Sequence, residues 1–177
     1  MSNRKPVRLC PLTPADETEF VAFYDEFMQA GGRIHPGVLR KYQGNFPAYL
    51  ALLEEWADSN RIPPRYVASD TLVLKDDAGR IYGMVSLRHA LSDDLLVSGG
   101  HIGYGIRPSE RGKGYGTRQL ALALETYREW QVEKVLVTCD KANLASAKVA
   151  RNNGGVLEDE IVEKDGNILQ RYWITLI

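Results

Sequence analysis

The stretch that decides the fold reads RPSERGKGYGT, residues 107–117, and lies between an apolar strand pattern and an apolar helix pattern. It holds three glycines and three basic side chains. Glycine loses more conformational freedom on folding than any other residue, so a cluster of glycines indicates a special task for the backbone. Two tasks fit this place: a tight turn, or a cradle of backbone N–H groups for an anion.

The patterns on either side of this stretch predict alternating strands and helices. Apolar periodicity predicts helices at 13–32, 45–58, 116–130 and 143–153. Strands are expected at 7–12, on both sides of the DDAG turn at 76–79, and at 101–108, 134–140, 155–163 and 168–177. Segment 134–140 has the pattern of a buried parallel strand, and 92–100 reads as a connection. The order β-α-α-β-β-β-α-β-α-β-β predicts an α/β fold with a mixed sheet, in a single domain spanning 1–177.

Composition excludes several classes of function. The 177 residues carry a net charge of −1, which gives no indication of a nucleic-acid partner. The chain has no apolar run that could span a membrane and no signal-peptide core at its start. Its two cysteines form no disulfide framework, which favours a reducing, cytoplasmic location. No metal site is predicted.

The anion cradle has a physical basis in this position. The first N–H groups of a helix have no partner within the helix, and the positive end of the helix dipole lies there. Segment 101–118 carries a local net charge of +3. The stretch is no P-loop, because Gly114 follows Lys113 where a Ser or Thr is needed, and its glycine spacing differs from the dinucleotide fingerprint. A glycine turn with solvated basic side chains is the alternative.

The motif Arg111-Gly-Lys-Gly-Tyr-Gly116 resembles the Arg/Gln-x-x-Gly-x-Gly/Ala signature of the GNAT superfamily of N-acetyltransferases. The stretch VTCDKANLASAKVARNNGG, residues 137–155, is similar to the fifth strand and following helix of that family. The wider pattern is especially similar to a group of predicted bacterial acetyltransferases. The motifs cover about residues 80–177, and residues 1–70 match in layout only. The resemblance implies a central sheet with helices on both faces and with its fourth and fifth strands splayed.

The resemblance also implies acetyl-CoA as co-substrate. Loop amides would hold its pyrophosphate, and the pantetheine arm would lie along the fourth strand, beside Tyr104. The cofactor-binding residues implied are Gly105, Ile106, Arg111, Gly112, Lys113, Gly114, Tyr115, Gly116, Thr117, Asn143 and Ser146. Asn143 has a second interpretation as a helix N-cap that accepts from the Ser146 N–H.

The catalytic residues of the family match this sequence less completely than the cofactor-binding residues do. Many relatives place a tyrosine that acts as general acid seven residues after this asparagine, where this chain has Ala150. Tyr104 or Tyr115 could take its place, or the CoA thiolate could leave without a general acid. Many relatives also place a carboxylate that acts as general base ten residues before the loop arginine, where this chain has His101. A neutral imidazole is a suitable base, although His101 could equally be a packed strand residue.

Three further side chains lie near these positions in the sequence. His89 ends the preceding strand and is a second candidate for the base. Cys139 has no activating partner in the sequence and is expected to be buried packing. Glu110 is expected to be a solvated loop residue.

The acceptor is expected to be a primary amine of a small molecule or peptide. Segment 11–60 has a local net charge of −5, which could steer a cationic amine, but two solvated helix faces explain it as well. The alternative function is a catalytically silent acyl-CoA-binding module with a sensing or partner role. A homodimer is compatible with the sequence.

Overall fold

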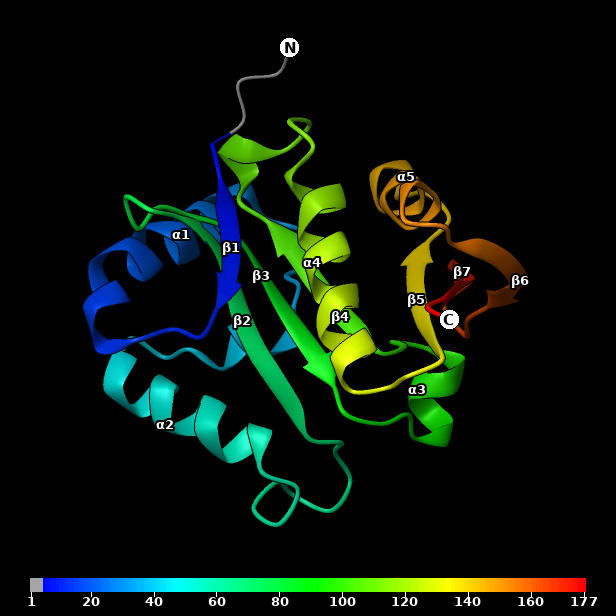
Figure 1. The fold of residues 1–177 in the computed structure, drawn as a ribbon, viewed down its shortest axis with the longest axis horizontal. Helices are drawn as coiled ribbons and strands as arrows, with labels where there is room; N and C mark the ends of the chain where they lie inside the picture. The colour runs from blue at the N-terminus through cyan, green and yellow to red at the C-terminus, as the bar shows by residue number, and fades with distance from the viewer. Residues whose placement is uncertain (1–4) are drawn as a thin grey trace.

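The structure of the protein is a computed structural model that describes residues 5–177. Its strands form two antiparallel sheets with the orders β1-β2-β3-β4 and β5-β7-β6 (Figure 1). The strands are β1 Val7–Cys10, β2 Ser69–Asp76, β3 Ile81–Arg88, β4 Ile102–Ile106, β5 Lys134–Asp140, β6 Val156–Val162 and β7 Ile168–Thr175. The predicted hairpin at 76–79 joins β2 to β3, and the Asp76 carboxylate accepts from the N–H groups of Ala78 and Arg80 at 3.0 Å each.

Helices cover both faces of the first sheet. The helical elements are η1 Pro14–Asp16, α1 Glu17–Ala30, η2 Gly37–Lys41, α2 Phe46–Ala57, α3 Asp93–Val97, η3 Pro108–Glu110, α4 Tyr115–Glu129 and α5 Leu144–Asn152. On one face, Phe20 of α1 and Phe46 of α2 pack in one cluster with Met84 of β3. On the other face, Leu120 of α4 packs in a second cluster with Val85. The predicted α/β class with helices on both faces is therefore confirmed.

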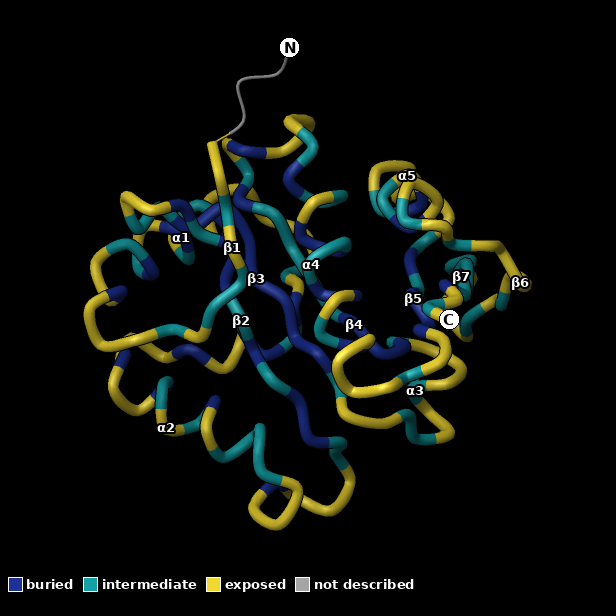
Figure 2. The backbone as a smooth tube through the Cα atoms, viewed as in Figure 1, coloured by how far each residue is buried: buried dark blue, intermediate teal, exposed yellow. Residues whose placement is uncertain are grey.

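The ends of the helices follow local sequence. The Asp16 carboxylate accepts from the Thr13 N–H at 2.8 Å, and the predicted first helix begins there as η1 before it continues as α1. The Asn45 side chain accepts from the Ala48 N–H at 3.0 Å and starts α2. Figure 2 shows that β3 and β5 are mostly buried, whereas β6 lies at the surface. Within residues 5–177, no helix has the length and apolar character that crossing a membrane requires.

Two local predictions were wrong. Segment 92–100 is more than a connection, because Ser92 accepts from the Leu95 N–H at 3.3 Å and caps the short helix α3. Strand β5 pairs along its length with β7 and is antiparallel to it. Strand β5 is buried at most of its positions, a pattern that parallel strands also show, so its sequence alone could not reveal an antiparallel partner.

The predicted mixed sheet is divided at β4 and β5. These two strands meet where the His101 N–H donates to the Leu136 carbonyl at 2.9 Å, and they separate toward their carboxyl ends (Figure 1). The splay of the fourth and fifth strands, expected from the family resemblance, is thus present. It leaves a gap between the two sheets, which α5 borders.

Candidate functional site

The edge of β4 offers backbone groups to this gap. The Arg88 N–H donates to the His101 carbonyl at 2.9 Å, and the Arg107 N–H donates to the Tyr82 carbonyl at 2.8 Å. Antiparallel pairing alternates, so the polar groups of Gly105 turn toward β3, and those of Tyr104 and Ile106 turn toward the gap. An extended ligand in the gap can therefore pair with Tyr104 and Ile106, while Gly105 acts only through its small size.

The glycine loop ends this strand and starts α4. Gly112 and Gly114 have φ angles of +74° and +85°, and Gly114 is the N-cap of the helix. Among residues 5–177, no hydrogen-bond acceptor pairs with the backbone N–H groups of 112–117. Alternation of left-handed residues with ordinary ones turns successive N–H groups to one side, which makes a concave site for an anion. Gly116 lies against α5, where an added Cβ would be 3.1 Å from Val149.

The charges near the loop are arranged differently from the sequence expectation. Arg107 is buried, with an exposed fraction of 3%, and its guanidinium pairs with Glu19 and with Glu26 of α1, the latter at 2.5 Å. It therefore serves to fix α1 to the strand end. Lys113 is held by Glu110 at 3.0 Å. Arg111 remains near the loop, where it donates to the Ile106 carbonyl at 3.1 Å and lies over Phe27.

Glu110 is no solvated loop residue, so that expectation was wrong. Its side chain is buried and pairs with Arg80 at 2.6 Å as well as with Lys113. Burial raises its pKa, but the hydrogen bonds from Arg80 and Lys113 outweigh burial and hold the pKa below its ordinary value. Glu110 thus anchors the loop to the start of β3, which sequence spacing could not indicate.

Tyr104 and Ser146 meet across the gap. The Tyr104 hydroxyl lies 2.8 Å from the Ser146 Oγ and joins β4 to α5. Burial raises the pKa of Tyr104 to about 12, so the phenol keeps its proton at neutral pH. Cys139 of β5 is buried beside Ser146, and burial raises the pKa of its thiol, which agrees with the packing role expected for it. Asn143 accepts from the Ser146 N–H at 3.1 Å, so it is an N-cap.

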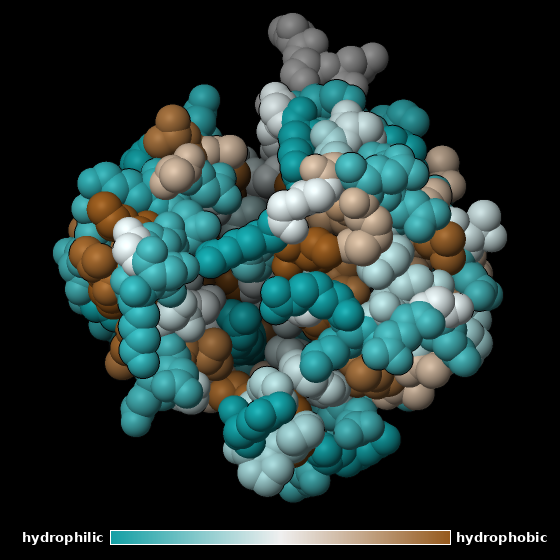
Figure 3. Space-filling model, turned by 180° about the vertical axis from the view of Figure 1, so that it is seen from behind, coloured by the Kyte–Doolittle hydropathy of each residue, from teal (hydrophilic) through white to brown (hydrophobic). Residues whose placement is uncertain are grey.

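The surface opens on the gap from the far side. In Figure 3 the face seen from behind is hollowed near its centre, between the half that carries β6 and β7 and the half that carries the four-stranded sheet. The chain therefore has a splayed strand pair, a glycine loop with free amides, and a protonated tyrosine between them. This arrangement can bind an extended ligand that carries phosphate and can donate a hydrogen bond to it from the phenol.

The family model of the acetyltransferase (GNAT) domain matches residues 7–156, which is most of the chain. The chain belongs to the GNAT acetyltransferase family. It is therefore an acyl-CoA-dependent N-acyltransferase, and acetyl-CoA is its co-substrate. A search of curated proteins finds no match.

Several solved structures share the fold at low sequence identity. The ribosomal-protein-S5-alanine acetyltransferase of Vibrio fischeri has a TM-score of 0.72 at 14% identity, over 98% of this chain and 94% of that one. The dodecameric spermidine N-acetyltransferase of Vibrio cholerae has a TM-score of 0.66 at 17% identity, over 96% and 94%. The yncA structure from Salmonella typhimurium, with its cofactor acetyl-CoA, has a TM-score of 0.62 at 15% identity, over 97% and 94%.

The two histidines predicted as candidate bases both have partners within the protein. The His101 ring is buried, and its Nδ1 accepts from the Leu136 N–H at 2.9 Å. Burial, and then the charge of Arg88, lowers the pKa of His101 to about 4. His89 pairs with Asp70 at 3.3 Å and packs against Trp130. The geometry thus favours the packing interpretation of His101, and the base role of either residue stays a prediction.

The remaining residues to which the family resemblance assigned a role lie near the loop and in α5. The Tyr115 ring is buried against Tyr82, with centroids 4.4 Å apart, so its hydroxyl is turned away from the gap and only its N–H belongs to the loop. Thr117 accepts from Asn152 at 3.4 Å and helps to join α4 to α5. Ala150 is fully buried and presents no polar group, which leaves Tyr104 as the tyrosine in the gap.

One candidate residue was missed in the sequence. His35 lies against the opposite side of β4, where an added Cβ at Gly105 would be 2.2 Å from the His35 carbonyl. Partial burial and the nearby charge of Arg40 lower the pKa of His35, so its ring is neutral at pH 7. It stands in a loop with no motif around it, and only the packing of segment 31–36 on β4 brings it to the site.

Proposed function

We propose that the protein transfers the acetyl group of acetyl-CoA to the primary amine of a small molecule or peptide. The observation that carries this proposal is the Tyr104 hydroxyl, which lies between β4 and α5 at 2.8 Å from Ser146. Acetyl-CoA supplies an activated acyl group as its thioester. Transfer to an amine forms a C–N bond and breaks the C–S bond, and the amine must lose one proton.

Tyr104 is proposed to donate a hydrogen bond to the departing sulfur. Its pKa of about 12 lies well above the value of about 8.5 for a free thiol, so the phenol stabilises the thiolate without losing its proton. Ser146 orients the phenol by its hydroxyl. The proton of the amine is proposed to leave through water, and His35, whose backbone carbonyl lies against Gly105 and whose pKa is lowered, is the candidate to accept it.

The co-substrate is proposed to bind with its pyrophosphate on the amides of 112–117. Arg111 would leave the Ile106 carbonyl, to which it donates at 3.1 Å, and turn to the phosphates. The vacated carbonyl and the Tyr104 backbone could then pair with the pantetheine arm. Side chains of Lys113 and Tyr115 take little part, because Glu110 and Tyr82 hold them.

Release of free thiol from acetyl-CoA over a panel of primary amines tests the activity, and mass spectrometry identifies the acetylated product. Turnover with at least one amine is expected. Binding of CoA without thiol release over the whole panel would instead support the silent acyl-CoA-binding module.

Melting curves with CoA and with dephosphorylated pantetheine test the phosphate site of the loop, because a ligand that binds only the folded state raises the melting temperature. Equal shifts with both ligands would show that the loop does not hold phosphate.

We further propose one acetyltransferase domain over 1–177, a cytoplasmic location and a homodimer. The cytoplasmic location is supported by two free cysteines.

The homodimer is supported by β6, an edge strand whose Val156 and Val162 are 70% and 71% exposed. Edge strands with exposed apolar side chains pair readily with a second chain. Sedimentation of the protein and of a Val156→Lys variant tests this, and an unchanged monomer in both would reject the dimer.

A further inference from the structure

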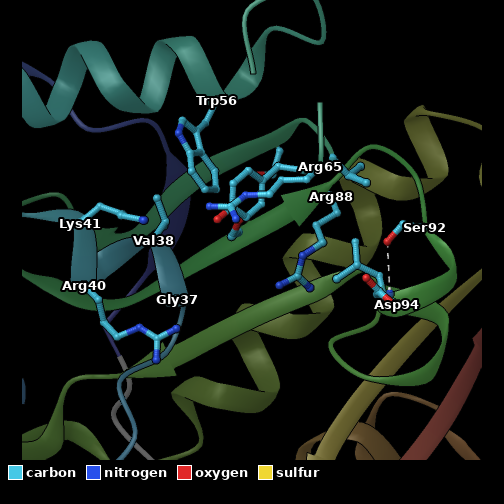
Figure 4. A pocket seen from close by; sticks show the side chains of 14 residues that line it. Gly37, Val38, Arg40, Lys41, Trp56, Arg65, Arg88, Ser92 and Asp94 are labelled. Atoms are coloured by element: carbon cyan, nitrogen blue, oxygen red, sulfur yellow. Dashed lines mark hydrogen bonds between the residues drawn. The ribbon is translucent and has the colours of Figure 1, made fainter. Parts of the chain in front are cut away.

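A cavity of about 390 Å³ lies on the glycine side of β4, opposite the face on which Tyr104 meets Ser146. Its floor includes Ser86 of β3, which pairs directly with Gly103 of β4. Figure 4 shows the side chains that line it: Arg40 and Lys41 belong to η2, Trp56 to α2 and Asp94 to α3. The cavity therefore borders the strand along which the thioester is proposed to lie.

The cavity is strongly basic. Four cationic side chains line it, against a single acid, Asp94; the cations are Arg40, Lys41, Arg65 and Arg88. Within residues 5–177, none of these four cations forms an ion pair with a carboxylate. Lys41 lies over Trp56 at 6.0 Å and Arg65 over Tyr66 at 4.8 Å. Their positive charge is thus left uncompensated by the part of the chain that the structure describes.

Arg88 is the central residue of this cavity. Its Nη1 donates to the carbonyls of Gly99 and Gly100 at 2.8 Å each, which fixes the guanidinium beneath the start of β4. Its Nη2 faces Gly103, where an added Cβ would lie 3.5 Å away. Nε and Nη2 have no acceptor among residues 5–177, so donors remain for a ligand. A partly buried guanidinium without a counter-ion is unfavourable unless an anion pairs with it.

Two serine hydroxyls stand beside this guanidinium. Ser69 and Ser86 are buried residues of neighbouring strands and line the floor of the cavity. No hydrogen bond of either hydroxyl is formed with residues 5–177, in contrast to Ser92, which caps α3. Hydroxyl donors next to an arginine fork match the oxygens of a carboxylate, which accept several hydrogen bonds in one plane.

We propose that this cavity binds the carboxylate of the acceptor, so that the substrate is an amino acid or peptide that carries both the amine and a free carboxylate. Arg88 binds the carboxylate oxygens, Ser69 and Ser86 donate to them, and Arg65 adds positive charge to the lining. The proposal rests on the proposed acetyl transfer to an amine. It also excludes polyamines as preferred acceptors, because a polycation would meet four positive charges and one negative charge.

Matched acceptors test the carboxylate directly. Thiol release is measured with a set of free amino acids and dipeptides and with the same compounds as carboxamides, next to phosphoethanolamine, ethanolamine and spermidine. The best free acid is expected to have a kcat/KM at least tenfold above its amide. Equal rates for acid and amide, or preference for spermidine, would overturn the proposal while leaving acetyl transfer intact. Preference for phosphoethanolamine over every free acid would also overturn it and indicate a phosphate site.

Variants locate the recognition. Arg88→Gln should remove the preference for acid over amide. Arg65 donates to no backbone carbonyl of residues 5–177, so Arg65→Gln should fold normally and should reduce the preference several-fold. Arg128→Gln, on the exposed end of α4, is the matched control and should retain the preference. A preference that survives both cavity variants would reject this site.

A binding measurement separates this proposal from the transfer reaction. In calorimetry with CoA present, an N-acetylamino acid from the set should bind more tightly than its carboxamide, and Arg88→Gln should abolish the difference. This result is expected even if no amine is turned over, in which case only the transfer reaction fails. Equal binding of acid and amide to the unmodified protein would reject the carboxylate site whatever the turnover.

Discussion

The Tyr104 hydroxyl and the Ser146 Oγ lie 2.8 Å apart and form a hydrogen bond between β4 and α5, across the gap where the two sheets separate. This contact places a phenol in the gap, and the buried Ala150 stands where the family resemblance implies a tyrosine on the helix. The same gap can thus be given a hydroxyl from a strand instead of a helix. A thiolate leaving group requires only a donor near the sulfur, whichever element supplies it.

Tyr104→Phe should lower kcat by about 10²-fold, because it removes the donor to the departing sulfur. CoA affinity should change little, since the ring and its packing remain. Because the pKa of Tyr104 is about 12, no limb of the pH–rate profile between pH 6 and 9 belongs to it. Ser146→Ala is the comparison and should cost less. Normal turnover in a folded Tyr104→Phe protein would remove this residue from the mechanism.

Gly114→Val should weaken CoA binding by about tenfold or more, equivalent to about 1.4 kcal/mol. A side chain at this helix start blocks the approach of phosphate to the loop amides. Gly166→Val is the matched control, because both glycines have φ of +85° and both substitutions strain the backbone by about 1–3 kcal/mol. Calorimetry with CoA should separate them. Similar CoA affinity for the two variants would identify the loop as an ordinary turn.

His101→Gln should leave turnover per folded molecule near normal and change the pH dependence of stability. The pKa of His101 is lowered in the folded protein to about 4, from 6.5. The unfolded chain therefore binds the proton more readily, and the folded state loses stability as pH falls from 6.5 toward 4. The loss amounts to about 3 kcal/mol. Urea titrations at pH 7 and pH 4 should show this loss in the unmodified protein and less of it in the variant.

The same variant also decides the base role. If His101 accepts the amine proton, its replacement lowers kcat by about 10²-fold or more and moves the acidic limb of the pH–rate profile. Packing alone predicts an unchanged limb. Rate and stability should be measured on the same preparations, so that a smaller folded fraction is not mistaken for slower chemistry.

Arg107→Met should destabilise the fold by about 3 kcal/mol, because Glu19 and Glu26 lose their shared partner in a mostly buried place. CoA binding should weaken as well, since Arg107 precedes the loop and fixes it to α1. Arg8→Met, in an exposed pair with Asp77, should cost less than about 1 kcal/mol. Denaturant midpoints compare the two. Equal midpoints would mean that Arg107 contributes only as a surface charge.

The sequence by itself determined the family, the order of the main elements and the place of the glycine loop that is proposed to bind the co-substrate. These depend on local properties: the positive φ of Gly114, the Asn143 and Asn45 caps, and the apolar periodicity of the helices. Each of these acts within a few residues along the chain. The splay of β4 and β5 could be expected only from the family resemblance, since neither strand shows it alone.

Only the tertiary structure decided the partners of the charged and titratable side chains. Arg107 pairs with Glu26, 81 residues away, and His101 accepts from Leu136, 35 residues away, so neither role has a sequence spacing. Arg88 ends a strand and belongs to no sequence motif of the site, yet packing places it in a cavity with three other cations. Burial and long-range contacts set whether such groups stabilise the fold, hold a loop or face a ligand, and these quantities exist only once the sheets and helices are assembled.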